Sequence, residues 1–321
     1  MARCQMAKIP PIQGEMMMNK TLFAPYLDVT VDAIWNDPLS PNGKPNPKYS
    51  QAAISHSVDG VYLAFLTADP NNNAAWGAYS SMPIAWAKPF CDALIEANIK
   101  VIVSFGGAAN YDVSARQTVD QLIATYQEVI DILGASQLDF DFENDLYDAD
   151  KTFTALSTIV KNNPDITLSL TLPVMPYGLV EKGLALVQKS VNAGLKMKVN
   201  GMAMDYGQGT DKNMGQAAVD VATSLKNQLK TYYPTLTDAE LYDLVQVTPM
   251  IGLNDDRSMF NFNDINTLSN FAKTNGVNLI SMWSLTRDRV GVGESASASY
   301  SGNPEQTKDF EYTERFTNAL K

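Results

Sequence analysis

The 321-residue chain has little of the chemistry on which many enzymes depend. Its only cysteines are Cys4 and Cys91, so the sequence offers neither a disulfide framework nor the ligand spacing of a zinc site. His56 is the only histidine and has no nucleophile motif near it, so we interpret it as a surface or packing residue. A histidine-dependent triad is excluded unless His56 serves it, and general acid chemistry therefore falls to carboxylates.

Positive charge and long apolar runs are also scarce. The formal net charge of -11 disfavours nucleic acid or an anionic membrane as a partner, whereas a neutral ligand such as a carbohydrate is compatible. No apolar run approaches the ~18 residues of a membrane span, and residues 1–20 lack the apolar core of a signal peptide. We expect a secreted protein whose signal was removed or which is exported by another route, and a cytoplasmic location stays open.

The rest of the chain alternates between short apolar runs and segments with helical spacing. The expected strands are 22–27, 60–66, 100–105, 138–142, 166–172, 199–206, 244–250 and 279–284. Helical patterns are expected over 89–97, 119–133, 153–160, 179–193, 217–229, 265–271 and 312–320. Eight repeats of β then α predict a closed (β/α)₈ TIM barrel, an α/β fold, as a single domain over 21–321. We interpret residues 1–20 as a tail or as vector or linker sequence.

Two segments near the start of this pattern are expected to be loops. The Pro- and Asn-rich sequence after Asp28 precedes the second strand, and 71–75 follows that strand. Trp76 and Trp86 flank the second loop, and either could be a platform on which a sugar stacks or a packing residue.

The most informative stretch is 136–144, Ser-Gln-Leu-Asp-Phe-Asp-Phe-Glu-Asn. In a strand, successive side chains point to opposite faces, so Asp139, Asp141 and Glu143 would share one face and the apolar residues the other. We expect the apolar face to pack under helices and the acids to point into the barrel at its C-terminal end, where barrel active sites lie. Carboxylates crowded inside a protein are costly unless they are hydrogen-bonded, share a proton or do chemistry.

Two other interpretations of the stretch fit less well. An exposed amphipathic strand would not have such apolar neighbours, and a calcium site needs flexible oxygen-rich turns with glycine. The sequence therefore favours a catalytic role for the acids.

Through this acidic stretch and further motifs on other predicted strands, the chain resembles glycoside hydrolase family 18, the chitinases and their relatives. The fourth-strand signature Asp-x-x-Asp-x-Asp-x-Glu is present with Ser136 in its first position, and Ser-x-Gly-Gly appears as 104–107 on the third strand. The sixth-strand motif Met-x-Tyr-Asp appears in altered form as 202–206, with Tyr206 after Asp205, and the eighth strand supplies Trp283. Two motifs at matching strand positions are more specific than either alone.

The resemblance implies a role for each matched residue. Glu143 would be the general acid, Asp141 would hold the substrate's N-acetyl group, and Asp139 would share a proton with it or shift it. Tyr206 would position the acetamido carbonyl and Trp283 would form the floor under the sugar. Further candidates for substrate binding are Asp205, Tyr26, Met204 and Asp255.

The implied activity is retaining hydrolysis of β-1,4 bonds in chitin or chito-oligosaccharides by substrate-assisted catalysis, without a cofactor or a metal. Only about thirty residues separate Met250 from Leu279, too few for the α+β insertion of many relatives, so we expect an open groove and internal cleavage. The expected partner is an N-acetylglucosamine-containing oligo- or polysaccharide, with no nucleic acid or membrane partner, and the expected state is a monomer. The alternatives are an endo-β-N-acetylglucosaminidase acting on N-glycans, a catalytically weak chitin-binding lectin, and a barrel enzyme with another substrate.

Overall fold

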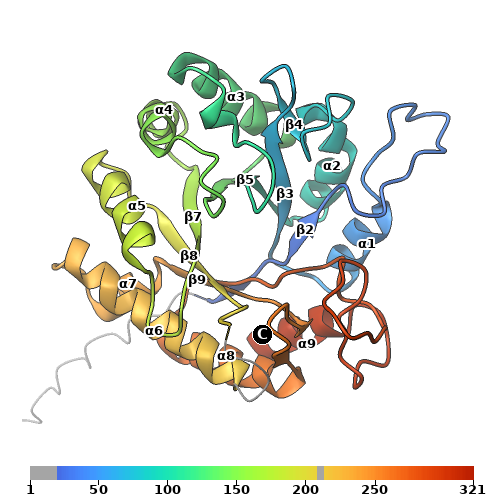
Figure 1. The fold of residues 1–321 in the computed structure, drawn as a ribbon, viewed down its shortest axis with the longest axis vertical. Helices are drawn as coiled ribbons and strands as arrows, with labels where there is room; N and C mark the ends of the chain where they lie inside the picture. Colours follow the sequence, from blue (N-terminus) through green and yellow to red (C-terminus); the bar gives the residue numbers. More distant parts are fainter. Residues whose placement is uncertain (1–19, 208–212) are drawn as a thin grey trace, which may run out of the picture.

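The structure is a computed structural model that describes residues 20–207 and 213–321. These residues form a barrel of parallel strands surrounded by helices (Figure 1). The parallel strands are β1 (Leu22–Phe23), β2 (Tyr26–Asp28), β3 (Gly60–Ala68), β5 (Lys100–Gly106), β6 (Gln137–Asp141), β7 (Thr167–Pro173), β8 (Lys198–Ala203), β9 (Val245–Pro249) and β12 (Leu279–Ile280). The helices are α1 (Pro47–Ser55), α2 (Lys88–Glu96), α3 (Val119–Leu133), α4 (Ala149–Asn162), α5 (Glu181–Asn192), α6 (Met214–Tyr232), α7 (Asp238–Tyr242), α8 (Phe262–Asn275) and α9 (Glu311–Leu320).

The barrel closes through its first strand, which is split in two. β1 pairs with β12 and β2 pairs with β3, while the remaining neighbours run in chain order from β3 through β5 to β9 and β12. Because β1 and β2 are separated by only two residues, the two ends of this path belong to one barrel position. The predicted (β/α)₈ barrel is confirmed. Between β9 and β12 lie the short strands β10 (Gly252–Leu253) and β11 (Met259–Phe260) and α8, so the predicted lack of an α+β insertion is confirmed.

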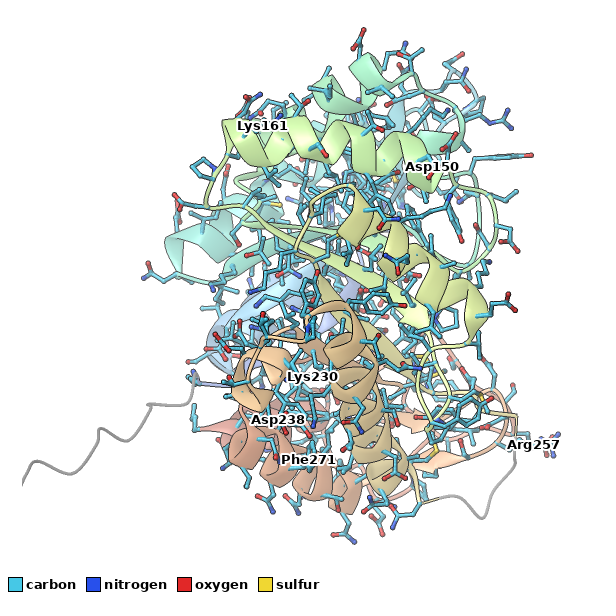
Figure 2. The ribbon with its side chains drawn as sticks, turned by 90° about the vertical axis from the view of Figure 1, so that its left-hand side faces the viewer. Asp150, Lys161, Lys230, Asp238, Arg257 and Phe271 are labelled. Atoms are coloured by element: carbon cyan, nitrogen blue, oxygen red, sulfur yellow. The ribbon has the colours of Figure 1, made fainter. Side chains whose placement is uncertain are left out.

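The helices pack their apolar stripes against the outer face of the sheet. α3 has the predicted range 119–133 and ends where Gly134 adopts a left-handed conformation. Figure 2 shows α4 from the side, with Asp150 in its first turn and Lys161 in its last. These charges complement the helix dipole.

Two predicted loops contain regular structure, and both predictions were wrong in that respect. Residues 47–55 form α1, because Asn46 caps the helix with its side chain and Pro47 suits the first helical position. Residues 74–76 form β4 (Ala74–Trp76), which pairs antiparallel with the end of β3. Asp69 stabilises the turn between β3 and β4, because its Oδ1 accepts hydrogen bonds from the backbone N–H groups of Asn71 and Asn73 at 2.8 and 2.9 Å.

The aromatic residues next to this hairpin are packing residues. Trp76 is fully buried and its Nε1 donates to the carbonyl of Ile84, in the 3₁₀-helix η1 (Ile84–Ala87), at 3.2 Å. Trp86 is also buried. Of the two roles considered for each residue, the structure supports packing.

Candidate active site

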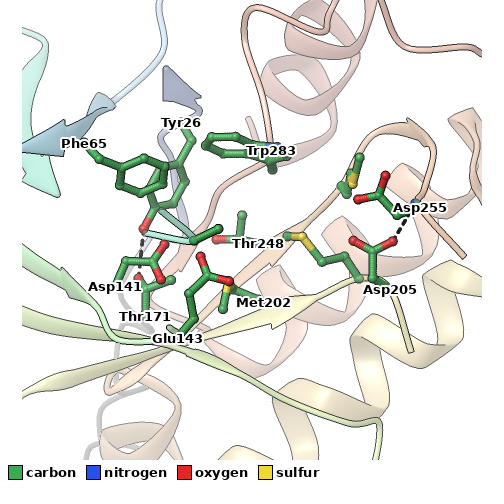
Figure 3. A pocket seen from close by; sticks show the side chains of 13 residues that line it. Tyr26, Phe65, Asp141, Glu143, Thr171, Met202, Asp205, Thr248, Asp255 and Trp283 are labelled. Atoms are coloured by element: carbon green, nitrogen blue, oxygen red, sulfur yellow. Dashed lines mark hydrogen bonds between the residues drawn. The ribbon is translucent and has the colours of Figure 1, made fainter. Parts of the chain in front are cut away.

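A pocket of about 190 Å³ opens at the carboxyl end of the barrel strands (Figure 3). It is lined by Tyr26, Phe65, Ala108, Asp141, Glu143, Thr171, Met202, Met204, Asp205, Thr248, Met250, Asp255 and Trp283. These residues come from strand ends that are far apart in the sequence, as expected for a barrel active site. The predicted residues Asp141, Glu143, Trp283, Asp205 and Asp255 are thus brought together.

Asp139 lies beneath this pocket and is completely buried, yet its carboxyl group is well supplied with hydrogen-bond donors. Its Oδ2 accepts from Tyr26 Oη at 2.8 Å and Ser104 Oγ at 2.7 Å. Its Oδ1 accepts from Ser169 Oγ at 2.5 Å and Thr171 Oγ1 at 2.8 Å. The cause is the strand register, which places Ser104 and Ser169 on either side of Asp139 in the barrel interior. Burial raises the pKa of Asp139, and the hydroxyl donors oppose that rise by stabilising the anion.

Asp141 and Glu143 form a coupled pair of acids above Asp139. Burial raises the pKa of Asp141 well above its usual value, and the charges of Glu143 and Asp139 raise it further. Burial also raises the pKa of Glu143, and its interaction with Asp141 opposes that rise. Oδ1 of Asp141 is buried and has no hydrogen-bond partner among the described residues. The pair therefore holds a proton to a higher pH than isolated acids would, which is what a general acid requires.

The Ser-x-Gly-Gly segment allows β5 to approach β6 closely at this point. Gly106 and Gly107 both have positive φ, of 87° and 92°. A Cβ atom on Gly106 would lie 2.2 Å from the carbonyl oxygen of Asp141, and Gly107 N donates to that same oxygen at 3.0 Å. The two glycines therefore fix the backbone that carries Asp141.

Aromatic rings form one wall of the pocket. Trp283 stacks on Phe65 with ring centroids 5.6 Å apart and meets the edge of Tyr26 at 6.0 Å. Tyr26 lines the pocket too, but its hydroxyl is engaged with Asp139 and Thr171. The partly buried rings of Trp283 and Phe65 leave an apolar surface suited to the apolar face of a pyranose.

Sequence reasoning missed Phe65 because strand alternation places it on the wrong face. Tyr62 and Ala64 belong to the small cluster inside the barrel, so Phe65 should point outward. The pairing of β3 with β5 shifts between Leu63 and Leu66, and this irregularity turns Phe65 inward with Ala64. Thr171, Met202, Thr248 and Met250 were also missed, and only their inward parity on predicted strands could have indicated them.

Two further acids lie on the opposite side of the pocket. Asp205 Oδ1 accepts from the backbone N–H of Asp255 at 2.7 Å, which ties the loop after β8 to the loop after β9. Burial raises the pKa of Asp205. Arg287 lies behind this pair, where its Nη2 donates to the carbonyls of Ile251 and Leu253 at 2.9 and 2.7 Å. Burial lowers the pKa of Arg287 to about 10.

Tyr206 is not among the described residues that line the pocket. Its ring is buried in the large core cluster, and Asp205 turns the backbone there with a positive φ of 48°. Met204, one place before Asp205, lines the pocket instead. Ser136 lies before β6 and donates to the carbonyl of Val101 at 3.3 Å, so it does not support the inner acids directly.

Within residues 20–207 and 213–321, no group of three or more His, Cys, Asp or Glu side chains is arranged to hold a metal ion. In the same described parts of the chain, no helix is long and apolar enough to cross a membrane.

No protein-family model matches the chain. The "Probable bifunctional chitinase/lysozyme" of Escherichia coli (strain K12) is 28% identical over 324 residues, covering 94% of this chain and 35% of the relative. "Endochitinase 11" of Metarhizium anisopliae is 28% identical over 288 residues, covering 84% of this chain and 53% of the relative. The chain thus spans about a third to about half of the length of these curated relatives.

Among solved structures, the catalytic domain of a hyperthermophilic chitinase from Pyrococcus furiosus matches with a TM-score of 0.79 and 29% identity, covering 94% of both chains. The catalytic domain of a family GH18 chitinase from the fern Peteris ryukyuensis shares the fold at 17% identity with a TM-score of 0.57, covering 93% of this chain and 98% of that chain. A GH18 chitinase from Pseudoalteromonas aurantia shares it at 16% identity with a TM-score of 0.54, covering 82% of this chain and 94% of that chain.

The barrel and its cluster of inward acids define a glycosidase-type catalytic domain. The sequence and structural matches to chitinases confirm the more particular resemblance, to the chitinase-like catalytic domains of glycoside hydrolase family 18.

Proposed function

We propose that this chain is a retaining glycoside hydrolase that cleaves β-1,4 bonds between N-acetylglucosamine units of chitin or chito-oligosaccharides. The observation that carries the proposal is the coupled pair Asp141 and Glu143, which opens into a pocket walled by Trp283 and is backed by the buried Asp139. The relatives are named as a chitinase/lysozyme and an endochitinase, which supports the same activity.

In the first step, protonated Glu143 donates its proton to the glycosidic oxygen, and the bond from that oxygen to the anomeric carbon breaks. The carbonyl oxygen of the substrate's own acetamido group attacks the anomeric carbon, giving an oxazolinium ion. Asp141 accepts a hydrogen bond from the acetamido N–H and places negative charge beside the developing cation. Burial and the charges of Glu143 and Asp139 keep the pKa of Asp141 high, so that Asp141 and Glu143 can share one proton.

In the second step, Glu143 removes a proton from water as that water attacks the anomeric carbon and reopens the oxazolinium ring. Two inversions at one carbon give net retention. Trp283 and Phe65 would bear the apolar face of the sugar, and Asp205, Asp255 and Met204 would contact it from the other side. The carbonyl-positioning role that the resemblance gives to Tyr206 has no geometric support, since Tyr206 lies outside the pocket.

We propose two further properties of this function, its mode of cleavage and its location. The short connection between β9 and β12 builds no high wall beside the pocket, which supports cleavage within a chain over release from its end. Insoluble chitin cannot enter a cell, so we propose that the chain acts outside it, and we propose action as a monomer.

The test is hydrolysis of a fluorogenic chitotriose substrate by the unaltered chain and by Glu143→Gln, which keeps the shape but cannot donate the proton. We expect the variant to be at least ~10³-fold slower in kcat, within the range of general acid loss. The matched control is Glu128→Gln, the same chemical change on the exposed face of α3, which should leave kcat unchanged.

Failure of the unaltered chain to cleave the substrate while both forms bind it equally would support the lectin alternative. Cleavage of an N-linked glycan core in preference to chitohexaose would support the endo-β-N-acetylglucosaminidase alternative.

A further inference from the structure

Trp35 is the most exposed tryptophan among the described residues, and the catalytic pocket does not use it. Its relative exposure is 52%, whereas Trp76 and Trp86 are buried and Trp283 lines the pocket. It lies on the long loop between β2 and α1, the blue segment that extends outward in Figure 1. A single exposed apolar side chain is ordinary on a protein surface, so the role of Trp35 depends on what surrounds it.

The position of the Trp35 ring is fixed by its neighbours. A Cβ atom on Gly43 would lie 2.5 Å from Cε3 of Trp35, so the ring packs directly on the bare backbone of this glycine. The ring centroid of Trp35 is 6.4 Å from that of Trp86, and Trp86 Nε1 donates to the carbonyl of Asn42 at 2.9 Å. These contacts hold the Trp35 ring in one position on the loop.

A cavity of about 240 Å³ is lined by Gly43, the residue on which the Trp35 ring packs. It is lined by Ser40, Pro41, Asn42, Gly43, Lys44, Ser81, Pro83, Ala85, Trp86 and Pro89. Apolar walls with a few hydroxyl and amide groups are typical of a site for a neutral polar ligand. The one charged group in this lining, Lys44, is ion-paired with Asp37, so the surface is close to neutral.

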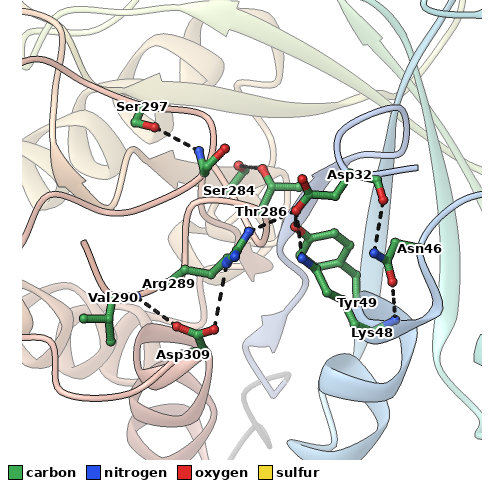
Figure 4. Close-up of polar contacts among 11 residues, drawn as sticks. Asp32, Asn46, Lys48, Tyr49, Ser284, Thr286, Arg289, Val290, Ser297 and Asp309 are labelled. Carbon is green, nitrogen blue, oxygen red and sulfur yellow. Dashed lines mark hydrogen bonds and ion pairs between the residues drawn. The ribbon is translucent and has the colours of Figure 1, made fainter. Parts of the chain in front are cut away.

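The loop that carries Trp35 is anchored at both its ends (Figure 4). Asp32 Oδ2 accepts from Lys48 Nζ at 2.7 Å, Tyr49 Oη at 2.8 Å and Arg289 Nη1 at 3.0 Å. Further along, the backbones of Ile34 and Lys44 exchange hydrogen bonds of 2.9 and 3.0 Å. A loop held in this way loses little entropy when a ligand binds.

The anchored loop also leaves the barrel at the same end as the catalytic pocket. It follows the carboxyl end of β2, whose residue Tyr26 lines that pocket. The described lining residues of the two cavities do not overlap. A polymer could therefore contact both sites at once, whereas a short oligosaccharide would occupy only the catalytic one.

We propose that Trp35 and the adjoining cavity form an auxiliary binding site for a chain of β-1,4-linked N-acetylglucosamine, separate from the catalytic pocket. Trp35 stacks on the apolar face of a pyranose, and the Ser40 and Asn42 side of the cavity faces sugar hydroxyl or acetamido groups. This proposal rests on the proposed function, because it takes the same polymer as the ligand.

The experiment compares binding to insoluble chitin in the Glu143→Gln background, where the polymer is not degraded. We expect Trp35→Leu to raise the dissociation constant about 3- to 10-fold, from loss of aromatic stacking. Trp35→Tyr keeps an aromatic face and should restore most of the affinity. The matched control is Tyr177→Leu, which removes another exposed aromatic ring, 68% exposed, and should bind as the parent does.

A second measurement uses the single variant Trp35→Leu with an intact Glu143. Its kcat/KM on soluble chitotriose should equal that of the unaltered chain, because a trisaccharide reaches only the catalytic pocket. Its rate on insoluble chitin should fall in parallel with binding.

Distinct results overturn distinct claims. If the unaltered chain cleaves chitotriose but Trp35→Leu binds insoluble chitin as tightly as its parent, the auxiliary site is wrong and the proposed function stands. If the unaltered chain neither cleaves chitotriose nor binds chitin, both fall. A loss of self-association in Trp35→Leu without a loss of chitin binding would show that this patch contacts a second copy, and would also overturn the proposal.

Discussion

The two faces of strand β6 differ sharply in chemistry, one being aromatic and the other acidic. On the outer face, Phe140 stacks on Phe105 at 5.3 Å between ring centroids and meets the edge of Tyr126 at 5.4 Å. On the inner face, Asp139 and Asp141 point into the barrel. One strand thus supplies apolar packing on one side and costly buried acids on the other, and the packing offsets what the acids cost.

The inner face is itself divided between its two acids. Asp139 has four hydroxyl donors, whereas Oδ1 of Asp141 is buried with no partner among the described residues. A buried acceptor without a donor is destabilising, and a ligand that brings a donor relieves it. The difference indicates that Asp139 is built into the fold and Asp141 is left available to substrate.

Among substitutions within β6, the largest expected effect comes from Asp141→Asn, which removes charge from the inner face and leaves the outer face intact. We expect kcat on chitotriose to fall about 10²- to 10³-fold, as when one preorganised group that stabilises a transition state is lost. The melting temperature should stay the same or rise, because a buried group with a raised pKa no longer has to ionise. Activity assays and thermal denaturation at neutral pH measure the two effects.

The control for this variant is Asp165→Asn, which makes the same change at an exposed turn. It should alter neither quantity. A clear drop in the melting temperature of Asp141→Asn would show that Asp141 stabilises the fold, and would contradict the division between the two acids.

The second effect comes from a substitution on the outer face. It is smaller, and it lowers stability instead of activity. Phe140→Leu should lower the free energy of unfolding by about 1–3 kcal/mol, because it removes ring contacts and leaves unfilled space. The folded variant should keep its kcat, since Phe140 does not reach the pocket. Denaturant unfolding gives the first quantity, and assays at a temperature where the variant is fully folded give the second.

A loss of kcat in fully folded Phe140→Leu would break the separation of the two faces. It would mean that the packing of Phe140 on Phe105 positions the acids on the other side of the strand.

Much of this arrangement could be predicted from the sequence, since a strand has a period of two. That period placed Asp139 and Asp141 inside and Phe140 outside, and the eight-fold repeat predicted the barrel. The hydroxyl partners of Asp139 could not be predicted, because they depend on the register of β5 and β7 against β6, which no local pattern specifies.

The other misses occur where the backbone departs from regular strand geometry. Phe65 faces the pocket because the pairing of β3 shifts beside it, and Tyr206 lies in the core because the chain turns at Asp205. Trp35 was not singled out either, because exposure of a loop residue depends on the contacts its loop makes, here with Gly43 and Arg289.

The smallest expected effect is on the pH dependence of the free energy of unfolding, and it tests the difference between the inner and outer faces of β6. Asp141 and Glu143 have pKa values raised above those of the unfolded chain, so between the unfolded and folded pKa values the folded state binds more protons than the unfolded state. The free energy of unfolding must then fall as pH rises through that range, and the loss is complete above the folded pKa values. In Asp141→Asn one of these two groups no longer titrates. The decline in melting temperature from acidic to neutral pH should therefore be shallower in Asp141→Asn than in the unaltered chain. In Phe140→Leu the slope should be unchanged, and only the melting temperature from which the decline starts should be lower.

Parallel declines in all three proteins would mean that acids elsewhere dominate the titration, such as the buried Asp112 and Asp288 with pKa values raised to about 6. The inner face of β6 would then contribute little to it.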